Sequence, residues 1–353
     1  MRKFNTILLI LGAGFLAYLV WSTGVGELCR ELGSLGWGLV PLVLSEGVAE
    51  FIHVAGWRYC LSEPHRSLSM IHLFNIRMAG YAINYLTPTA AIGGEVTKAA
   101  LLASNHRGPA AVTGVLIGKL CFAFAHLLFV VLGSIITLWR LNLPRTLWLG
   151  MCISGGLVAG GMITFLLLQK YGKLGALLRW LVARRVGDTV LKKAAQDISM
   201  VDEALKLFYR ERPLDLVRAI CWHQVGYSLG IVQTWLFFNL LHQDVSWMVA
   251  AGLWFLGMWF DLLTFAVPMN LGTLEGTRIV ALRAIGYSSL TGMTYGVALR
   301  LAQLVWSVYG LVVYGFLVRH AARQPSVAPA LSKPAGCGST PCGCAPEMSR
   351  SAD

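Results

Sequence analysis

The chain has 353 residues, of which 56% are hydrophobic and 13% charged, with a formal net charge of +12. A soluble domain needs about a quarter charged residues to cover its surface, and the mean hydropathy of this chain is +0.63. Ten lysines and arginines gather between Lys170 and Arg212, beside apolar segments. Such placement marks the cytoplasmic side of a membrane rather than a nucleic-acid site. Composition therefore predicts one integral membrane domain over residues 1–320.

Six apolar segments are long enough to cross the hydrocarbon core as helices, which takes about 20 residues. They are residues 4–23, 37–60, 110–138, 146–169, 216–241 and 296–318. No small-residue cleavage pattern follows the first one, so we expect an uncleaved helix and not a signal peptide. The charge bias places both termini and the basic loop 170–213 in the cytoplasm, where the loop attracts anionic headgroups.

Two further apolar segments, 70–104 and 247–286, are interrupted. The interruptions are Asn84 through Pro88 and Gly93-Gly94 in the first segment, and Pro268 through Gly272 in the second. Proline removes a backbone donor and glycine weakens a helix, so each segment should bend. Unpaired backbone at membrane depth needs protein or a water-filled cavity around it, so both breaks indicate an internal cavity. To keep the charge-based topology, the two segments must be re-entrant hairpins opening to opposite sides.

One motif recurs in the two interrupted segments. Proline is followed by glutamate, threonine and a basic residue at identical spacing: Pro88, Glu95, Thr97 and Lys98 in the first, and Pro268, Glu275, Thr277 and Arg278 in the second. Matching spacing in matching contexts indicates a duplication. Together with the charge bias it predicts an inverted repeat, with repeats at about 37–138 and 216–318, as in many secondary transporters. The fold class is thus an all-α polytopic membrane protein.

The motif also predicts a substrate-binding site. A helix that restarts after a break points free N–H groups and its positive dipole end into the cavity, which suits an anionic headgroup. We expect the ion pairs Glu95–Lys98 and Glu275–Arg278 to handle the substrate. The alternative is that both pairs are structural, although a charge at the bilayer centre costs at least ~2.5–3.5 kcal/mol and is seldom without function. The break residues Asn84, Pro88, Gly93, Gly94, Pro268 and Gly272 complete the predicted site.

Other polar residues inside apolar segments are secondary candidates. Glu46, Glu50 and His53 share one helix face, where they either line the cavity or bond to neighbouring helices. Lys119 has the same two interpretations. Asp261 precedes Pro268 and is a possible partner of Arg278, Arg283 or Arg300. Arg300, early in the last span, is itself a secondary cavity candidate.

Residues 321–353 are rich in proline, alanine, serine and glycine and should form a disordered tail. Cys337, Cys342 and Cys344 in that tail are weak candidates for a soft-metal site, because thiolates suit such metals but a fourth ligand is missing. We expect no cofactor.

The motif residues carry a resemblance. The run Gly80-Tyr-Ala-Ile-Asn84-Tyr-Leu-Thr-Pro88, the run Gly93-Gly94-Glu95 and the spacing of Pro268, Gly272 and Glu275 resemble the flippase-like membrane domain of lysylphosphatidylglycerol synthases. Gly36-Trp37-Gly38 and Gly56-Trp57-Arg58 are similar to its free-standing hopanoid-associated branch. The resemblance implies translocation of a lipid between leaflets. We expect the protein to lack the soluble aminoacyl-transferase domain of the synthases, which leaves the identity of the lipid open.

Three functions remain after these arguments. The favoured one is a flippase that moves an anionic or isoprenoid/hopanoid-type lipid across the bacterial inner membrane. The alternatives are an integral-membrane enzyme acting on a lipid headgroup, such as a transferase or phosphatase, and an ion channel or small-solute carrier. Glu95 and Glu275 would be the acid and base of such an enzyme.

Overall fold

Long helices correspond to all six predicted spans. The computed structural model describes residues 2–86, 92–105, 110–170, 207–208, 210–264 and 267–323, and no strand occurs among them. The long helices are α1 (Arg2–Thr23), α3 (Leu39–Cys60), α7 (Ala110–Arg140), α8 (Arg145–Lys170), α11 (Pro213–Leu240) and α14 (Ser289–Arg323). The predicted all-α class is therefore confirmed. Pro88, most of the basic loop and the cysteine-containing tail lie outside the described residues.

Each interrupted segment forms two helices. The first gives α5 (Met70–Leu86) and α6 (Ile92–Asn105), and the second gives α12 (Trp247–Leu263) and α13 (Thr273–Ala284). Between α12 and α13, the short turn η2 (Pro268–Asn270) contains left-handed backbone: φ is 59° at Met269 and 48° at Asn270, and Gly272 follows at 74°. The chain therefore leaves the helical conformation where the proline and glycine predicted a break.

Three short helices were not expected from the sequence. Residues 24–36 lie between the first two predicted spans, and they contain α2 (Val25–Leu35); η1 (Gly36–Gly38) and α4 (Glu63–Arg66) are also present. Left-handed glycines bound α2, with φ of 94° at Gly24 and 48° at Gly36. The rule used for the predicted spans requires about 20 apolar residues, and α2 is too short and too charged to satisfy it. Thr294 of α14 donates a hydrogen bond to Glu31 of α2 and so fixes the short helix to the bundle.

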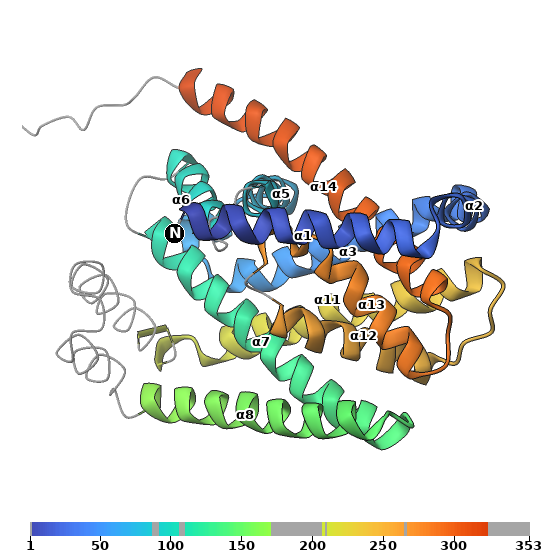
Figure 1. Ribbon diagram of the computed structural model, residues 1–353. Helices are drawn as coiled ribbons and strands as arrows, with labels where there is room; N and C mark the ends of the chain where they lie inside the picture. Colours follow the sequence, from blue (N-terminus) through green and yellow to red (C-terminus); the bar gives the residue numbers. More distant parts are fainter. Residues whose placement is uncertain are drawn as a thin grey trace, which may run out of the picture.

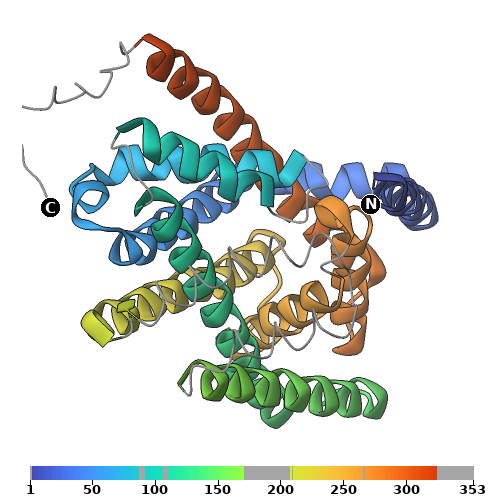
Figure 2. The ribbon, with the colours of Figure 1, turned by 90° about the vertical axis from the view of Figure 1, so that its left-hand side faces the viewer.

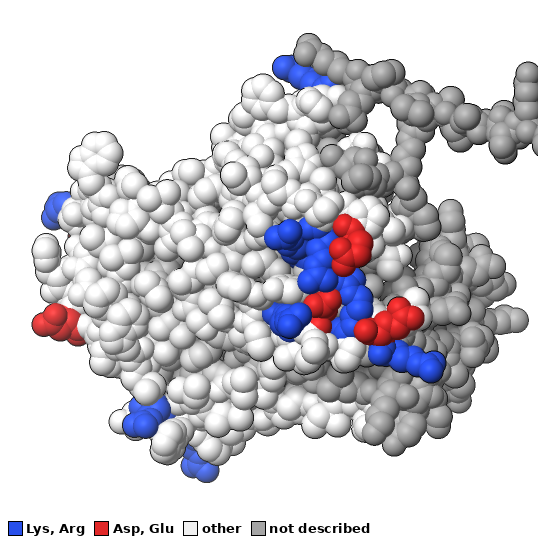
Figure 3. All heavy atoms as spheres, turned by 180° about the vertical axis from the view of Figure 1, so that it is seen from behind, with Lys and Arg blue, Asp and Glu red and all other residues white. Residues whose placement is uncertain are grey.

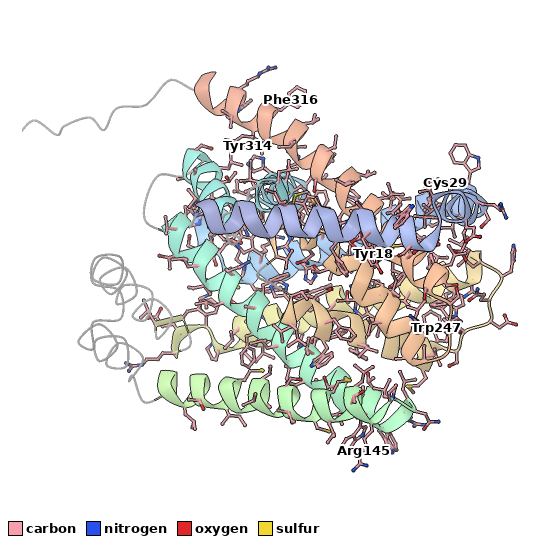
Figure 4. All side chains as sticks on the ribbon, viewed as in Figure 1. Tyr18, Cys29, Arg145, Trp247, Tyr314 and Phe316 are labelled. Atoms are coloured by element: carbon pink, nitrogen blue, oxygen red, sulfur yellow. The ribbon has the colours of Figure 1, made fainter. Side chains whose placement is uncertain are left out.

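The outer surface is apolar, as a lipid-facing surface must be. Among the described residues, four segments are long and apolar enough to cross a membrane: Val25–Cys60, Ala110–Arg140, Arg145–Thr164 and Ser289–His320. Large apolar side chains are exposed on them, including Leu157 and Phe316, and Figure 4 shows Phe316 pointing outward from α14. On the face shown in Figure 3, most charged side chains gather in one patch. The chain is thus a multi-pass membrane protein.

The helices of the two predicted repeats pack in matching pairs (Figures 1 and 2). If α3, α5, α6 and α7 correspond to α11, α12, α13 and α14, then the contact of α5 with α14 corresponds to that of α12 with α7. The contacts of α6 with α7 and of α13 with α14 correspond in the same way, and α3 packs on its own counterpart, α11. This pattern is the one expected of two repeats related by a two-fold axis.

The contact between α3 and α11 is reciprocal at the residue level. His53 of α3 packs on Gly226 of α11, where an added Cβ would lie 2.6 Å from the ring, and His223 packs on Gly56, with a corresponding distance of 2.8 Å. The two histidine Nδ1 atoms are 3.1 Å apart. Each helix thus contributes the same His-x-x-Gly sequence, and the pairing runs in opposite chain directions.

The ends of the helices lie at two sides of the molecule. In Figure 1 the N-terminus, the last turn of α8 and the last turn of α14 are at the left. The connections from α7 to α8, from α11 to α12 and from α13 to α14 are at the right. This arrangement has the sidedness that the charge bias predicts, and the assignment of the two sides to cytoplasm and exterior stays a prediction.

Candidate functional site

A cavity of about 210 Å³ lies beside the first interrupted segment. We call it the basic cavity, because three cationic and two anionic side chains are among the residues that line it: Arg77, Lys98, Lys119, Glu50 and Glu95, together with Trp57. These residues come from four helices, α3, α5, α6 and α7. The sequence predicted Glu95 and Lys98 as site residues and Glu50 and Lys119 as secondary candidates, and the fold brings all four to one place.

Glu95 is the centre of the ion pairs in the basic cavity. Its Oε2 atom is 2.5 Å from Lys98 Nζ, which confirms the predicted pair, and its Oε1 atom is 3.5 Å from Lys119 Nζ on α7. In the same cavity Arg77 Nε is 2.5 Å from Glu50 Oε2. Arg77 was not a predicted site residue. Its position in the middle of an apolar helix was the available signal, because a buried arginine requires an anionic partner.

The start of α6 is held in place by polar and steric contacts with α5. The Gly94 N–H donates to Asn84 Oδ1 at 2.7 Å, so the asparagine caps the restarted helix. An added Cβ at Gly94 would lie 2.1 Å from the Gly80 carbonyl oxygen. Only glycine permits this approach of the two backbones. Asn84 and Gly94 therefore position Glu95, and in this structure they are part of the support of the site rather than of its cationic surface.

The predicted pair Glu275–Arg278 is wrong. Glu275 is fully buried and pairs with Arg300 of α14, which contacts both of its carboxylate oxygens. Arg278 instead binds Asp261 of α12 through two hydrogen bonds, of 3.1 and 2.7 Å. A spacing of three residues allows a contact within one helix, but here neighbouring helices supply a better partner for each charge.

The ion pair that recurs in the two predicted repeats joins two different helices. In the first half Glu95 pairs with Lys119 of α7, and in the second half Glu275 pairs with Arg300 of α14. The sequence separations are 24 and 25 residues, so this signal was present but lay outside the short motif. In both halves a carboxylate at the start of the restarted helix binds a cation on the following long helix.

The two halves differ in exposure to a cavity. Arg300 donates to the carbonyls of Met269 and Asn270 at 3.3 and 2.9 Å and to the Tyr85 hydroxyl at 3.2 Å. It therefore fixes the left-handed turn η2 and ties it to α5. Within the part of the chain that the structure describes, Glu275 and Arg300 are held by these partners, whereas Glu95, Lys98 and Lys119 line the basic cavity. The basic cavity of the first half is therefore the better candidate for the functional site.

A second cavity, of about 160 Å³, adjoins the first and shares Glu50 and Phe122 with it. Glu46, His53, His126 and Asp261 are among its lining residues. The prediction that Glu46, Glu50 and His53 share one face is thus confirmed, and Asp261 reaches the same cavity while paired with Arg278. Among the described residues no cluster suited to a metal ion occurs, and the weak candidates Cys337, Cys342 and Cys344 lie outside the described part of the chain.

Comparison with known proteins gives the family. Residues 6–310 match the family described as the lysylphosphatidylglycerol synthase TM region. A UPF0104 membrane protein of Methanothermobacter thermautotrophicus is 24% identical over 302 residues, which cover 82% of this chain and 88% of that relative. No solved structure matches the chain. Membership of the hopanoid-associated branch stays a prediction. With a match over most of its length, the chain belongs to the family of the lysylphosphatidylglycerol synthase transmembrane region.

Proposed function

We propose that this protein carries a lipid between the leaflets of the membrane that holds it. One observation carries the proposal: a cation-rich cavity lies inside a bundle of membrane-spanning helices, at the point where one segment is broken. Charges inside a membrane mark substrate pathways, because burying them without a function is costly. Transporters of the inverted-repeat type place their substrate site beside such breaks. Membership of a family named after a lipid synthase supports a lipid as the substrate.

Inverted repeats would allow the two interrupted segments to open alternately to the two sides. The reciprocal packing of α3 on α11 and the matching helix pairs support this part of the proposal. We expect single cysteines in loop 170–213 to react with a membrane-impermeant reagent only from the cytoplasm, and a cysteine at Tyr287 only from outside. The measurement is labelling of intact cells against inverted vesicles of the bacterial inner membrane. Labelling of position 287 from the cytoplasm would contradict the inverted arrangement.

The alternative function is an enzyme that acts on a lipid headgroup. The experiment that separates the two uses purified protein in proteoliposomes containing one fluorescent lipid at a time. If the protein transports the lipid, a reductant added outside will quench about all of the dye, and not only the half in the outer leaflet. The lipid itself will give no new product by mass spectrometry. An enzyme predicts a new lipid product by mass spectrometry, without the additional quenching. Protein-free liposomes, and a water-soluble dye trapped inside the proteoliposomes, serve as the controls for leakage.

A further inference from the structure

The second cavity lies between the two predicted repeats. Its volume is about 160 Å³, and its lining residues come from α3 and α7 of the first repeat and from α11 and α12 of the second. His53 and Gly226, which meet in the contact of α3 with α11, are among them. Transporters of the inverted-repeat type bind their coupling ions at the interface between the repeats. The position of the second cavity therefore suits an ion that powers transport.

Three carboxylates line the second cavity, and one of them has no cationic partner. Glu50 is paired with Arg77 at 2.5 Å, and Asp261 is paired with Arg278 at 2.7 Å. Among the described residues, no lysine, arginine or histidine forms an ion pair with Glu46. A carboxylate inside a membrane bundle is costly to keep charged without a partner, and it becomes neutral by taking up a proton. A proton is therefore the cation that this wall of the cavity calls for.

The polar neighbour of Glu46 is an amide and not a cation. Gln233 of α11 is only 2% exposed, shares a hydrogen bond with Glu46 and donates through Nε2 to the Leu42 carbonyl at 3.0 Å. An amide has donor N–H groups and an acceptor oxygen, so it can donate to a carboxylate or accept from a carboxylic acid. Gain or loss of a proton by Glu46 therefore requires no cation to move.

Two histidines supply further proton acceptors on the wall of the cavity. His53 is 4% exposed, and its Nδ1 atom shares one hydrogen with His223 Nδ1 at 3.1 Å. Its Nε2 atom has no hydrogen-bond partner in the described part of the chain. His126 of α7 lines the same cavity. A neutral imidazole accepts a proton on one nitrogen and can release one from the other, so histidines often act as proton shuttles.

The tyrosines around Glu46 already have hydrogen-bond partners. The Tyr227 hydroxyl donates to the Phe122 carbonyl at 3.2 Å, and the hydroxyls of Tyr295 and Thr234 are 2.6 Å apart. Glu46 and the two histidines are thus the groups of the cavity wall that remain for proton exchange. The ionisable groups that face Glu46 or adjoin it are Glu50 and His53 on α3, Arg77 and Tyr81 on α5, His126 on α7, Tyr227 on α11, Asp261 on α12 and Tyr295 on α14.

Glu50 connects the second cavity to the basic cavity. It lines both, and it lies one helical turn from Glu46 on the same face of α3. Charges of the same sign at this spacing repel each other. A proton on Glu46 removes this repulsion and lowers the negative potential at Arg77, the partner of Glu50. The basic cavity is therefore more positive when Glu46 is protonated, and the occupancy of one cavity affects the other.

We propose that the second cavity is a proton-binding site and that its proton is the coupling ion of the lipid carrier. The Glu46 carboxylate takes up a proton from one side of the membrane and becomes a carboxylic acid. It returns to a carboxylate when the proton leaves to the other side. The coupling rests on the proposed function, whereas binding of the proton does not.

The first experiment detects the proton by infrared spectroscopy of the purified full chain while the pH is raised. We expect the carbonyl band of a carboxylic acid in an apolar environment, which disappears with rising pH and is missing in Glu46→Gln. Glu46→Asp keeps a carboxyl group and should shift the band without removing it. Glu27→Gln changes an exposed carboxylate of α2 and should leave the band unchanged. A Glu46→Gln spectrum identical to that of the wild type would overturn the site.

The second experiment tests coupling in proteoliposomes that contain a fluorescent lipid, with the membrane potential clamped. If one proton is exchanged per lipid, a gradient of about one pH unit should drive the ratio of dye between the leaflets toward about tenfold, because both ratios represent the same free energy. The initial fast phase of quenching by an external reductant measures the outer-leaflet fraction. Glu46→Gln should leave the dye evenly distributed under the same gradient, and Glu27→Gln should behave as the wild type. A sodium gradient should have no effect.

The outcomes separate the proton site from the proposed function. Loss of both the infrared band and the response to the pH gradient in Glu46→Gln supports the site and the coupling. An infrared band that depends on Glu46, in a protein that moves no lipid, would leave the proton site in place and end the transport proposal. Lipid movement by the wild type that ignores the pH gradient, or that follows the sodium gradient, would overturn the coupling.

Discussion

Replacing Arg300 by glutamine should destabilise the protein strongly. Removing the cation leaves the fully buried Glu275 carboxylate unpaired, and it also frees the carbonyls of Met269 and Asn270 in the left-handed turn. Breaking a buried ion pair on one side costs about 3–5 kcal/mol. The measurement is the free energy of unfolding, obtained by titrating the detergent-solubilised protein with a denaturant.

Two further variants show that the loss comes from the stranded charge. The double variant Glu275→Gln with Arg300→Gln should be more stable than Arg300→Gln alone, because no unpaired charge remains. Arg145→Gln, at the exposed start of α8, should change stability by less than about 0.5 kcal/mol. An Arg300→Gln protein as stable as the wild type would contradict a structural role for this pair.

Glu95→Gln should have the opposite profile, with a large loss of transport and a small loss of stability. Its two lysine partners face a cavity, so losing the carboxylate does not strand a charge in a closed interior. Without this competitor the lysines hold an anionic substrate more tightly and release it more slowly. We expect the initial rate of lipid movement to fall by about tenfold or more, which corresponds to about 1.4 kcal/mol.

The transport assay on Glu95→Gln is best run beside the denaturant titration. The expected combination is slower transport with a free energy of unfolding close to that of the wild type. Glu27→Gln, on the exposed surface of α2, should behave as wild type in both assays. A Glu95→Gln protein that transports normally but unfolds as easily as Arg300→Gln would assign Glu95 the same structural role as Glu275.

The sequence predicted the helices well and the ion pairs only in part. Span lengths and proline–glycine breaks are local properties, and they placed α5, α6, α12 and α13 correctly. The partner of Lys98 was also local, since Glu95 lies one turn away. Glu275 was assigned to Arg278 by the same rule, and the rule failed because α14 and α12 brought Arg300 and Asp261 closer. Side-chain pairing in a bundle depends on which helices are neighbours, and a short motif does not contain that information.

Other sequence patterns recur in both halves but are not part of the short motif, and the rule for span length does not detect them. The basic residue about 25 positions after each glutamate recurs in both halves, as does His-x-x-Gly in α3 and α11. The helix α2 was missed because it is amphipathic and short, while a search for spans finds long apolar helices.

The contact between α3 and α11 has the form of an interface between two molecules. A contact in which His53 meets Gly226 while His223 meets Gly56 is isologous: the same patch is used on both sides. Closed two-fold dimers of identical subunits produce contacts of this kind. A half-length chain with one His-x-x-Gly helix would make this contact with a second copy of itself. The predicted duplication would place such a dimer interface within one polypeptide and leave the two halves free to diverge, one with the ion pair Glu275–Arg300 and the other with the basic cavity.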